Sequence, residues 1–425
     1  MKHAKRRPAC AVLLFLLLSW HAIGHAQDSS QDPYRLDASA LQTMHVTMIA
    51  RQSNLKNLNA NKQAGITRVD SIVNFEGSYK TGGYGPTGKF QHHWYYTMVG
   101  LPPDRNQTMT FRAPIIPVSI ELLAPVGILA NYNGHPLYYD ATQYVQPVVN
   151  SPIFQNARYS SSKQPTQFTD AVMRAEFHHG AKGRWHTLLA PVVAANYVMK
   201  VPYGSYYYAL NADGSCCAFV LIDYSKFSSL FLPTGTADSS TPAGNAEISG
   251  EIATRDISTF LFPNTYLYVG NPRNCCILGF HTVDYQPGTA GHGNAPRGYV
   301  LNYSSWITPG TFSSGPKDVT AVSHEIAETF NDPFIAGDGI HGITPWWLSP
   351  NGNCEDVLED GDVIEGLPNA TYPVTLNHYT YHPQNEALLP WFEFERHSDA
   401  IGHAYSYPDA FTLTALSPVE RPNCK

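Results

Sequence analysis

Residues 317–330 read KDVTAVSHEIAETF, and this stretch gives the clearest helix prediction in the chain. Its apolar residues recur at the three- and four-residue spacing of one helix face, which predicts a stripe packed on a core. They are Val319, Val322, Ile326 and Phe330. His324 and Glu328 are four residues apart, so they would share the opposite side of the helix. The helix should end at residues 331–333, because the proline there cannot continue it.

The polar side of this helix carries the pattern H-E-x-x-E, formed by His324, Glu325 and Glu328. In the familiar H-E-x-x-H pattern, two histidines bind zinc and the glutamate after the first acts as general base on metal-bound water. Glu325 keeps the position of that base, and Glu328 replaces the second histidine. A carboxylate is a sound zinc ligand, but it also admits manganese, iron or calcium. The same residues could instead form the polar face of an ordinary surface helix.

A second group of carboxylates follows at residues 353–362, which read NCEDVLEDGD. This density is unusual in a chain with only 14% charged residues. Zincins take their third ligand from an element beyond the helix. Glu359 and Asp362 flank Gly361, whose freedom permits a tight turn, so both could point at one position. The alternatives are a solvated acidic loop or a calcium site, although the spacing does not match an EF-hand loop.

Together these motifs resemble the secreted zincin-like proteins related to the phosphate-induced (exordium-like) family. Members of that group read S-H-E-x-x-E, then D-P or N-P, then E-x-G/A-D. The corresponding residues here are 323–328, 332–333 and 359–362, and the runs 274–281 and 381–387 are similar to segments of bacterial relatives. The resemblance covers about residues 270–395 and leaves residues 27–200 uncovered.

The resemblance implies a metal centre of zincin type, with Zn²⁺ as the first expected metal. The metal ligands it implies are His324, Glu328, Glu359 and Asp362, the last as a ligand or as a partner that orients one. Glu325 would be the general base. His382 would stabilise a developing oxyanion or act as a further metal ligand. The sequence leaves a second interpretation open, in which His382 is a buried histidine satisfied by hydrogen bonds.

Residues 1–26 predict a secretory signal peptide, with cleavage near Ala26 and a secreted or periplasmic location. Basic residues open the segment, and the apolar run at residues 11–19 is too short to span a bilayer. The whole chain has a formal net charge of −7, and removing the basic segment makes the remainder more acidic. An acidic chain of this kind lacks the basic surface that nucleic-acid binding requires. No segment after the predicted signal peptide has enough consecutive apolar residues to predict a membrane span.

The remaining sequence predicts an α+β protein. Residues 27–200 would form a β-rich region of unknown role, and residues 201–425 a zincin-like metal-binding domain with one active-site helix. Strands are expected at residues 91–99, 216–223, 258–268, 275–283 and 298–304. Abundant tyrosine, proline and glycine, with little charge, favour strands and loops over a helical bundle.

Six of the seven cysteines follow the predicted signal peptide. They are Cys216, Cys217, Cys275, Cys276, Cys354 and Cys424. An even number in an exported chain predicts disulfides, whose pairing the spacing leaves open. A zinc-thiolate site is the competing interpretation, but no C-x-x-C pair is present.

The leading hypothesis for function is a secreted metal-dependent peptidase that acts on a peptide or protein substrate. One alternative is a non-catalytic exported protein in which a structural metal ties the helix to residues 353–362. Another is a cell-surface or glycan-binding protein that uses the region 27–200.

Overall fold

The fold is that of a computed structural model, which describes residues 32–43, 69–82, 91–124, 137–335, 347–355 and 357–416. The predicted signal peptide, residues 1–26, lies outside the described residues, as do Asp356 and Cys424. Within the described ranges, no helix is both long enough and apolar enough to cross a membrane.

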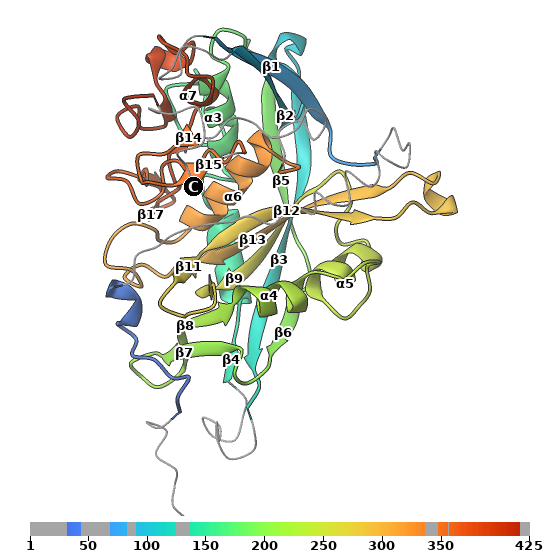
Figure 1. Ribbon diagram of the computed structural model, residues 1–425, viewed down its shortest axis with the longest axis vertical. Helices are drawn as coiled ribbons and strands as arrows, with labels where there is room; N and C mark the ends of the chain where they lie inside the picture. The colour runs from blue at the N-terminus through green and yellow to red at the C-terminus, as the bar shows by residue number, and fades with distance from the viewer. Residues whose placement is uncertain are drawn as a thin grey trace, which may run out of the picture.

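A seven-stranded mixed sheet runs through the molecule (Figure 1), in the order β12–β13–β9–β3–β4, with β5 and β6 also paired to β3. The strands are β3 (Thr108–Leu122), β4 (Leu137–Tyr139), β5 (His186–Val193), β6 (Tyr197–Val201), β9 (Ile257–Pro263), β12 (Gly279–Gln286) and β13 (Arg297–Trp306). β3 pairs in parallel with β9, and β9 with β13, whereas β12 runs antiparallel to β13. The chain therefore combines sheets and helices, as the α+β prediction expects.

Smaller sheets flank the large one. A four-stranded sheet has the order β11–β10–β8–β7, and β1 and β2 form an antiparallel hairpin. These strands are β1 (Asn74–Gly82), β2 (Gln91–Val99), β7 (Tyr206–Leu210), β8 (Cys216–Asp223), β10 (Thr265–Tyr268) and β11 (Cys275–Ile277). The strand expected at 258–268 is divided between β9 and β10. The break falls at Asn264, whose positive φ of 32° interrupts the extended backbone.

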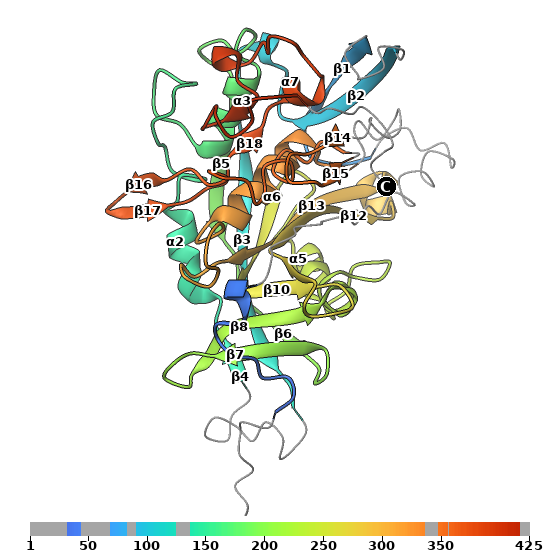
Figure 2. The ribbon, with the colours of Figure 1, turned by 60° about the vertical axis from the view of Figure 1, so that its left-hand side comes forward.

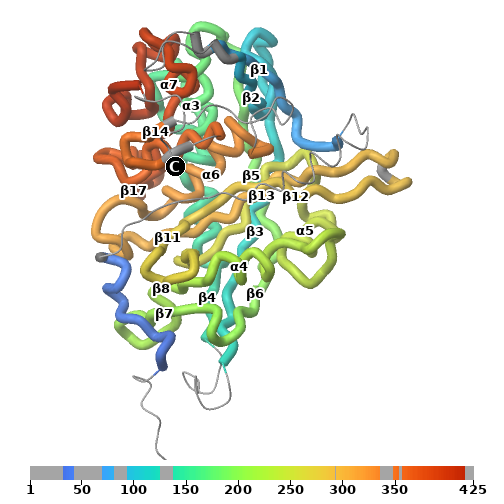
Figure 3. Tube along the Cα trace, viewed as in Figure 1, coloured from blue at the N-terminus to red at the C-terminus, as the bar shows by residue number. Residues whose placement is uncertain are grey.

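The two regions predicted from the sequence share the large sheet. The expected boundary after residue 200 falls within β6, and β3 pairs with β9 from the other side of that boundary. Figure 3 shows this along the Cα trace, where β3 lies beside strands from the second half of the chain. Alternating patterns indicate which segments are strands, but not which strands become neighbours.

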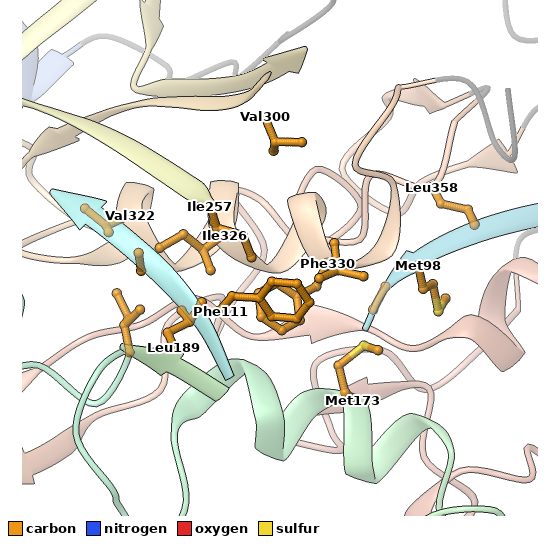
Figure 4. Close-up of a cluster of buried hydrophobic side chains, with 14 of the residues drawn as sticks. Met98, Phe111, Met173, Leu189, Ile257, Val300, Val322, Ile326, Phe330 and Leu358 are labelled. Atoms are coloured by element: carbon orange, nitrogen blue, oxygen red, sulfur yellow. The ribbon is translucent and has the colours of Figure 1, made fainter. Parts of the chain in front are cut away.

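Helix α6 (Thr320–Asn331) packs against β13 and β12, with β2 and α3 (Phe168–Glu176) also in contact. Figure 4 shows Val322, Ile326 and Phe330 turned into the apolar cluster that includes Phe111. The predicted apolar stripe is thus confirmed. The helix begins three residues later than predicted, because Asp318 has a positive φ of 43° and cannot be helical.

The other side of α6 faces the chain after residue 347 (Figures 1 and 2). The Gln384 N–H donates to Ser323 Oγ at 2.8 Å, and the Asp362 N–H donates to Glu328 Oε1 at 3.2 Å. Every residue of α6 is buried as a result. The interpretation of its polar side as a solvated surface face is therefore wrong, because the C-terminal segment covers it.

Candidate metal centre

The first cluster joins the helix to the loop after β15 (Cys354–Glu355). His324 Nε2 lies 3.1 Å from Glu328 Oε1 and 3.3 Å from Asp362 Oδ1. The three side chains form a group that could hold a metal ion, each with one ligand atom near the others. Four-residue helical spacing aligns His324 with Glu328, as predicted, and the backbone contact at Asp362 brings the third side chain to them.

A second group includes a histidine that sequence reasoning missed. His281, on β12, places Nδ1 3.3 Å from Glu328 Oε2 and 3.7 Å from Glu325 Oε2. His281, Glu325 and Glu328 form a second group that could hold a metal ion. His281 lies in β12 and ends the run 274–281, which carries part of the family resemblance. That position was the available signal.

Burial makes these side chains unusual. The five residues of the two groups are between 0 and 2% exposed. No hydrogen bond of normal geometry satisfies His281 Nδ1, His324 Nε2 or Asp362 Oδ1. Buried polar groups left without partners cost about 1–3 kcal/mol each, and more when charged. A cation bound in each group would satisfy the atoms of that group.

The carboxylates and imidazoles change one another's protonation. Burial opposes a charge on His281, but the neighbouring Glu325 and Glu328 outweigh it and raise the pKa of His281 to about 10. Burial raises the pKa of Glu325. Burial has the same effect on Glu328, but the charge of His324 outweighs it and lowers the pKa of Glu328. A metal would therefore bind by displacing protons from the imidazoles.

The acidic loop contributes two residues in different ways. Asp362 belongs to a ligand group, whereas Glu359, predicted as a ligand, hydrogen-bonds to Asp362 and is itself 1% exposed. Gly361 lies between them, and a Cβ added there would come within 2.5 Å of His324 Nδ1. Glycine is needed here for close approach of the backbone to the imidazole.

Two more buried carboxylates, Asp360 and Glu386, lie outside both groups. Burial raises the pKa of Asp360 and the pKa of Glu386 well above their usual range. Asn331 Nδ2 donates to Asp360 Oδ2 at 2.6 Å. Burial therefore disfavours the charged form of both side chains.

His382 is held apart from both groups. Its Nδ1 donates to Asp318 Oδ2 at 2.7 Å, and its backbone N–H donates to Asp318 Oδ1 at 2.8 Å. The His382 side chain is 20% exposed, whereas that of Asp318 is fully buried. This arrangement fixes the imidazole tautomer and leaves Nε2 free to act as an acceptor.

The ligand separations fit a metal of ordinary size. A tetrahedral ion with bonds of about 2.0–2.1 Å to nitrogen and oxygen separates its ligand atoms by about 3.3–3.4 Å. The separations of 3.1 and 3.3 Å around His324 are close to this value. Imidazole and carboxylate ligands suit zinc, manganese or iron. The described residues can therefore hold a divalent metal, whose identity the geometry does not select.

The cysteines form bonds between adjacent residues. Cys216 pairs with Cys217 at the start of β8, and Cys275 pairs with Cys276 in β11. The prediction of disulfides is confirmed for these four cysteines. The side chain of Cys354 and all of Cys424 lie outside the described part of the chain.

Comparisons of the chain with known protein families, with curated proteins and with solved structures find no match. The function proposed below therefore depends on the residues and geometry of this chain.

Proposed function

We propose that the protein is a secreted metal-dependent peptidase of the zincin-like type. It would bind a divalent metal beside α6, and Zn²⁺ is the metal we expect before any other. The observation that carries this proposal is the convergence of His324, Glu328 and Asp362, all buried, with ligand atoms 3.1–3.3 Å from one another along the His324 contacts. The resemblance to the phosphate-induced family is part of the same proposal.

A bound zinc ion would supply Lewis acidity and lower the pKa of a water molecule. Glu325 stands next to the first ligand in sequence, with Oε1 3.9 Å from His324 Nε2. Burial raises the pKa of Glu325 toward neutrality, which suits a residue that takes up and returns a proton near pH 7. Glu325 is therefore the proposed general base.

His382 has a separate proposed role. The hydrogen bond from His382 to Asp318 orients the ring. The His382 side chain is partly exposed, whereas the proposed ligand side chains are buried, so His382 could contact a substrate. A hydrogen bond from His382 to the substrate carbonyl would require a proton on Nε2 as well, so the imidazolium is the form that would steady developing negative charge.

The test uses the full chain, its metal content by elemental analysis, and hydrolysis of a peptide library. His324→Ala should lose the metal bound beside α6 together with hydrolysis. Glu325→Gln should still bind metal at His324 while hydrolysis falls by at least a hundredfold. Glu76→Gln changes an exposed glutamate on β1 and should behave as the native chain. Library cleavage that survives Glu325→Gln unchanged would contradict the proposed base.

A second candidate is favoured by the burial of the ligands. Structural zinc sites are closed, whereas catalytic sites keep one position open. Because His324, Glu325 and Glu328 are fully buried, a structural metal joining α6 to the 353–362 loop also fits. In that case a chelator would lower the melting temperature of the protein, and the metal-loaded protein would not hydrolyse the peptide library. The glycan-binding alternative stays a prediction.

A further inference from the structure

The carboxylate of Glu328 faces two different histidines with its two oxygens. Oε1 lies 3.1 Å from His324 Nε2, and Oε2 lies 3.3 Å from His281 Nδ1. Each histidine also has its own second carboxylate, Asp362 for His324 and Glu325 for His281. From this we infer that the site holds two divalent metal ions bridged by Glu328, an inference that rests on the proposed metal centre.

One ion cannot easily bind both histidines. Bonds of about 2.1 Å place two ligand nitrogens of one ion at most about 4.2 Å apart. Among the described residues, His281 and His324 belong to different groups of potential ligands. Glu328 is the shared member of the two groups. A single ion would therefore satisfy one histidine and leave the other without a ligand role.

Each ion would receive an equivalent set of one imidazole and two carboxylates, which suits zinc, manganese or iron. Glu325 approaches His281 through Oε2, so its Oε1 stays available for a proton. The role of Glu325 as base is therefore compatible with its role as a ligand. Metal pairs about 3.5–4 Å apart serve hydrolytic enzymes by binding the attacking and leaving oxygens together.

Metal stoichiometry tests the inference. The full chain is stripped with a chelator, loaded with Zn²⁺, desalted and measured by elemental analysis. Two zinc ions per chain are expected. One ion per chain would leave the proposed metal centre standing and overturn the bridged pair. No bound zinc would overturn both, so the two failures are distinguishable.

Variants identify the ligands of each ion. Asp362→Asn and Glu325→Gln should each reduce the content from two ions to one, because each removes a carboxylate from one group only. Glu328→Ala should reduce it below one. Glu247→Gln removes a buried carboxylate outside the cluster and should keep two ions, with near-UV circular dichroism as the check on folding. Two ions retained in Asp362→Asn and in Glu325→Gln would overturn the assignment.

The bridge has its own readout. Mn²⁺ replaces Zn²⁺ in the loaded chain, and electron paramagnetic resonance distinguishes two coupled manganese ions from isolated ones. The native chain should show the coupled signal, and Asp362→Asn should show only an isolated ion. A native chain with two isolated ions would contradict the bridge through Glu328.

Discussion

The backbone of Gly361 lies directly against the imidazole of His324, where an added Cβ would come within 2.5 Å of Nδ1. The contact lets the loop bring Asp362 to the ring, and it leaves no space for any larger residue. A glycine that the sequence analysis interprets as a turn residue is therefore part of the candidate metal centre.

Gly361→Ala should displace the His324 ring or the loop and weaken metal binding at least tenfold, with a loss of about 1–3 kcal/mol in stability. Titration with Zn²⁺ followed by calorimetry measures the change. Gly183→Ala is the matched control, because a Cβ at Gly183 meets nothing within 4 Å. Equal zinc affinity in the two variants would show that the Gly361 contact is unimportant.

The buried carboxyl group of Glu176 predicts that the stability of the fold depends on pH. Burial raises the pKa of Glu176 to about 8, against an ordinary value of 4.5. Between these values the folded state holds a proton that the unfolded state has released, so the stability that Glu176 contributes falls as pH rises. The loss should be complete above about pH 8.

Glu176→Gln removes this titration. Between pH 5 and pH 9 the native chain should lose about 2–4 kcal/mol more stability than the variant, measured by urea unfolding. The comparison uses the change of stability with pH, because any constant cost of placing an amide at this buried position cancels. Glu76→Gln, at an exposed position, should keep the native slope. Parallel curves for Glu176→Gln and the native chain would refute the buried titration.

Asp318 is proposed as a positioning residue for His382. Asp318→Asn would still accept both backbone N–H groups, but its amide would face His382 Nδ1 and favour the opposite tautomer. Nitrogen NMR of the imidazole should show the proton moving from Nδ1 to Nε2. If the chain hydrolyses peptides, kcat should fall about 10–100-fold with metal content unchanged, because a neutral ring stabilises negative charge less than the imidazolium does. An unchanged tautomer would contradict the assigned role.

Metal binding should stabilise the fold, because the ligands come from β12, α6 and the loop after β15. At a hundredfold excess of free zinc over its Kd, the native chain should gain about 2.7 kcal/mol, seen as a higher melting temperature that a chelator reverses. His324→Ala should respond less to both additions. A native melting temperature unaffected by zinc and by chelator would argue against a metal in either a catalytic or a structural role.

The sequence by itself determined the local elements. The apolar stripe at Val322, Ile326 and Phe330 set the length and orientation of α6, because helical periodicity depends on near neighbours. The same reasoning aligned His324 with Glu328 and located β8 and β13. Turn chemistry at Asp318 and Asn264 was harder to predict, since a positive φ there follows from contacts outside the local pattern.

Only the tertiary structure decided which distant residues meet. His281 reaches Glu328 because β12 pairs with β13 beneath α6, and Asp362 rather than Glu359 reaches His324 because Gly361 packs on the ring. Strand order and loop approach depend on contacts between residues far apart in the chain. Periodicity reports which face of an element is apolar, but it carries no information about the partner that covers the face.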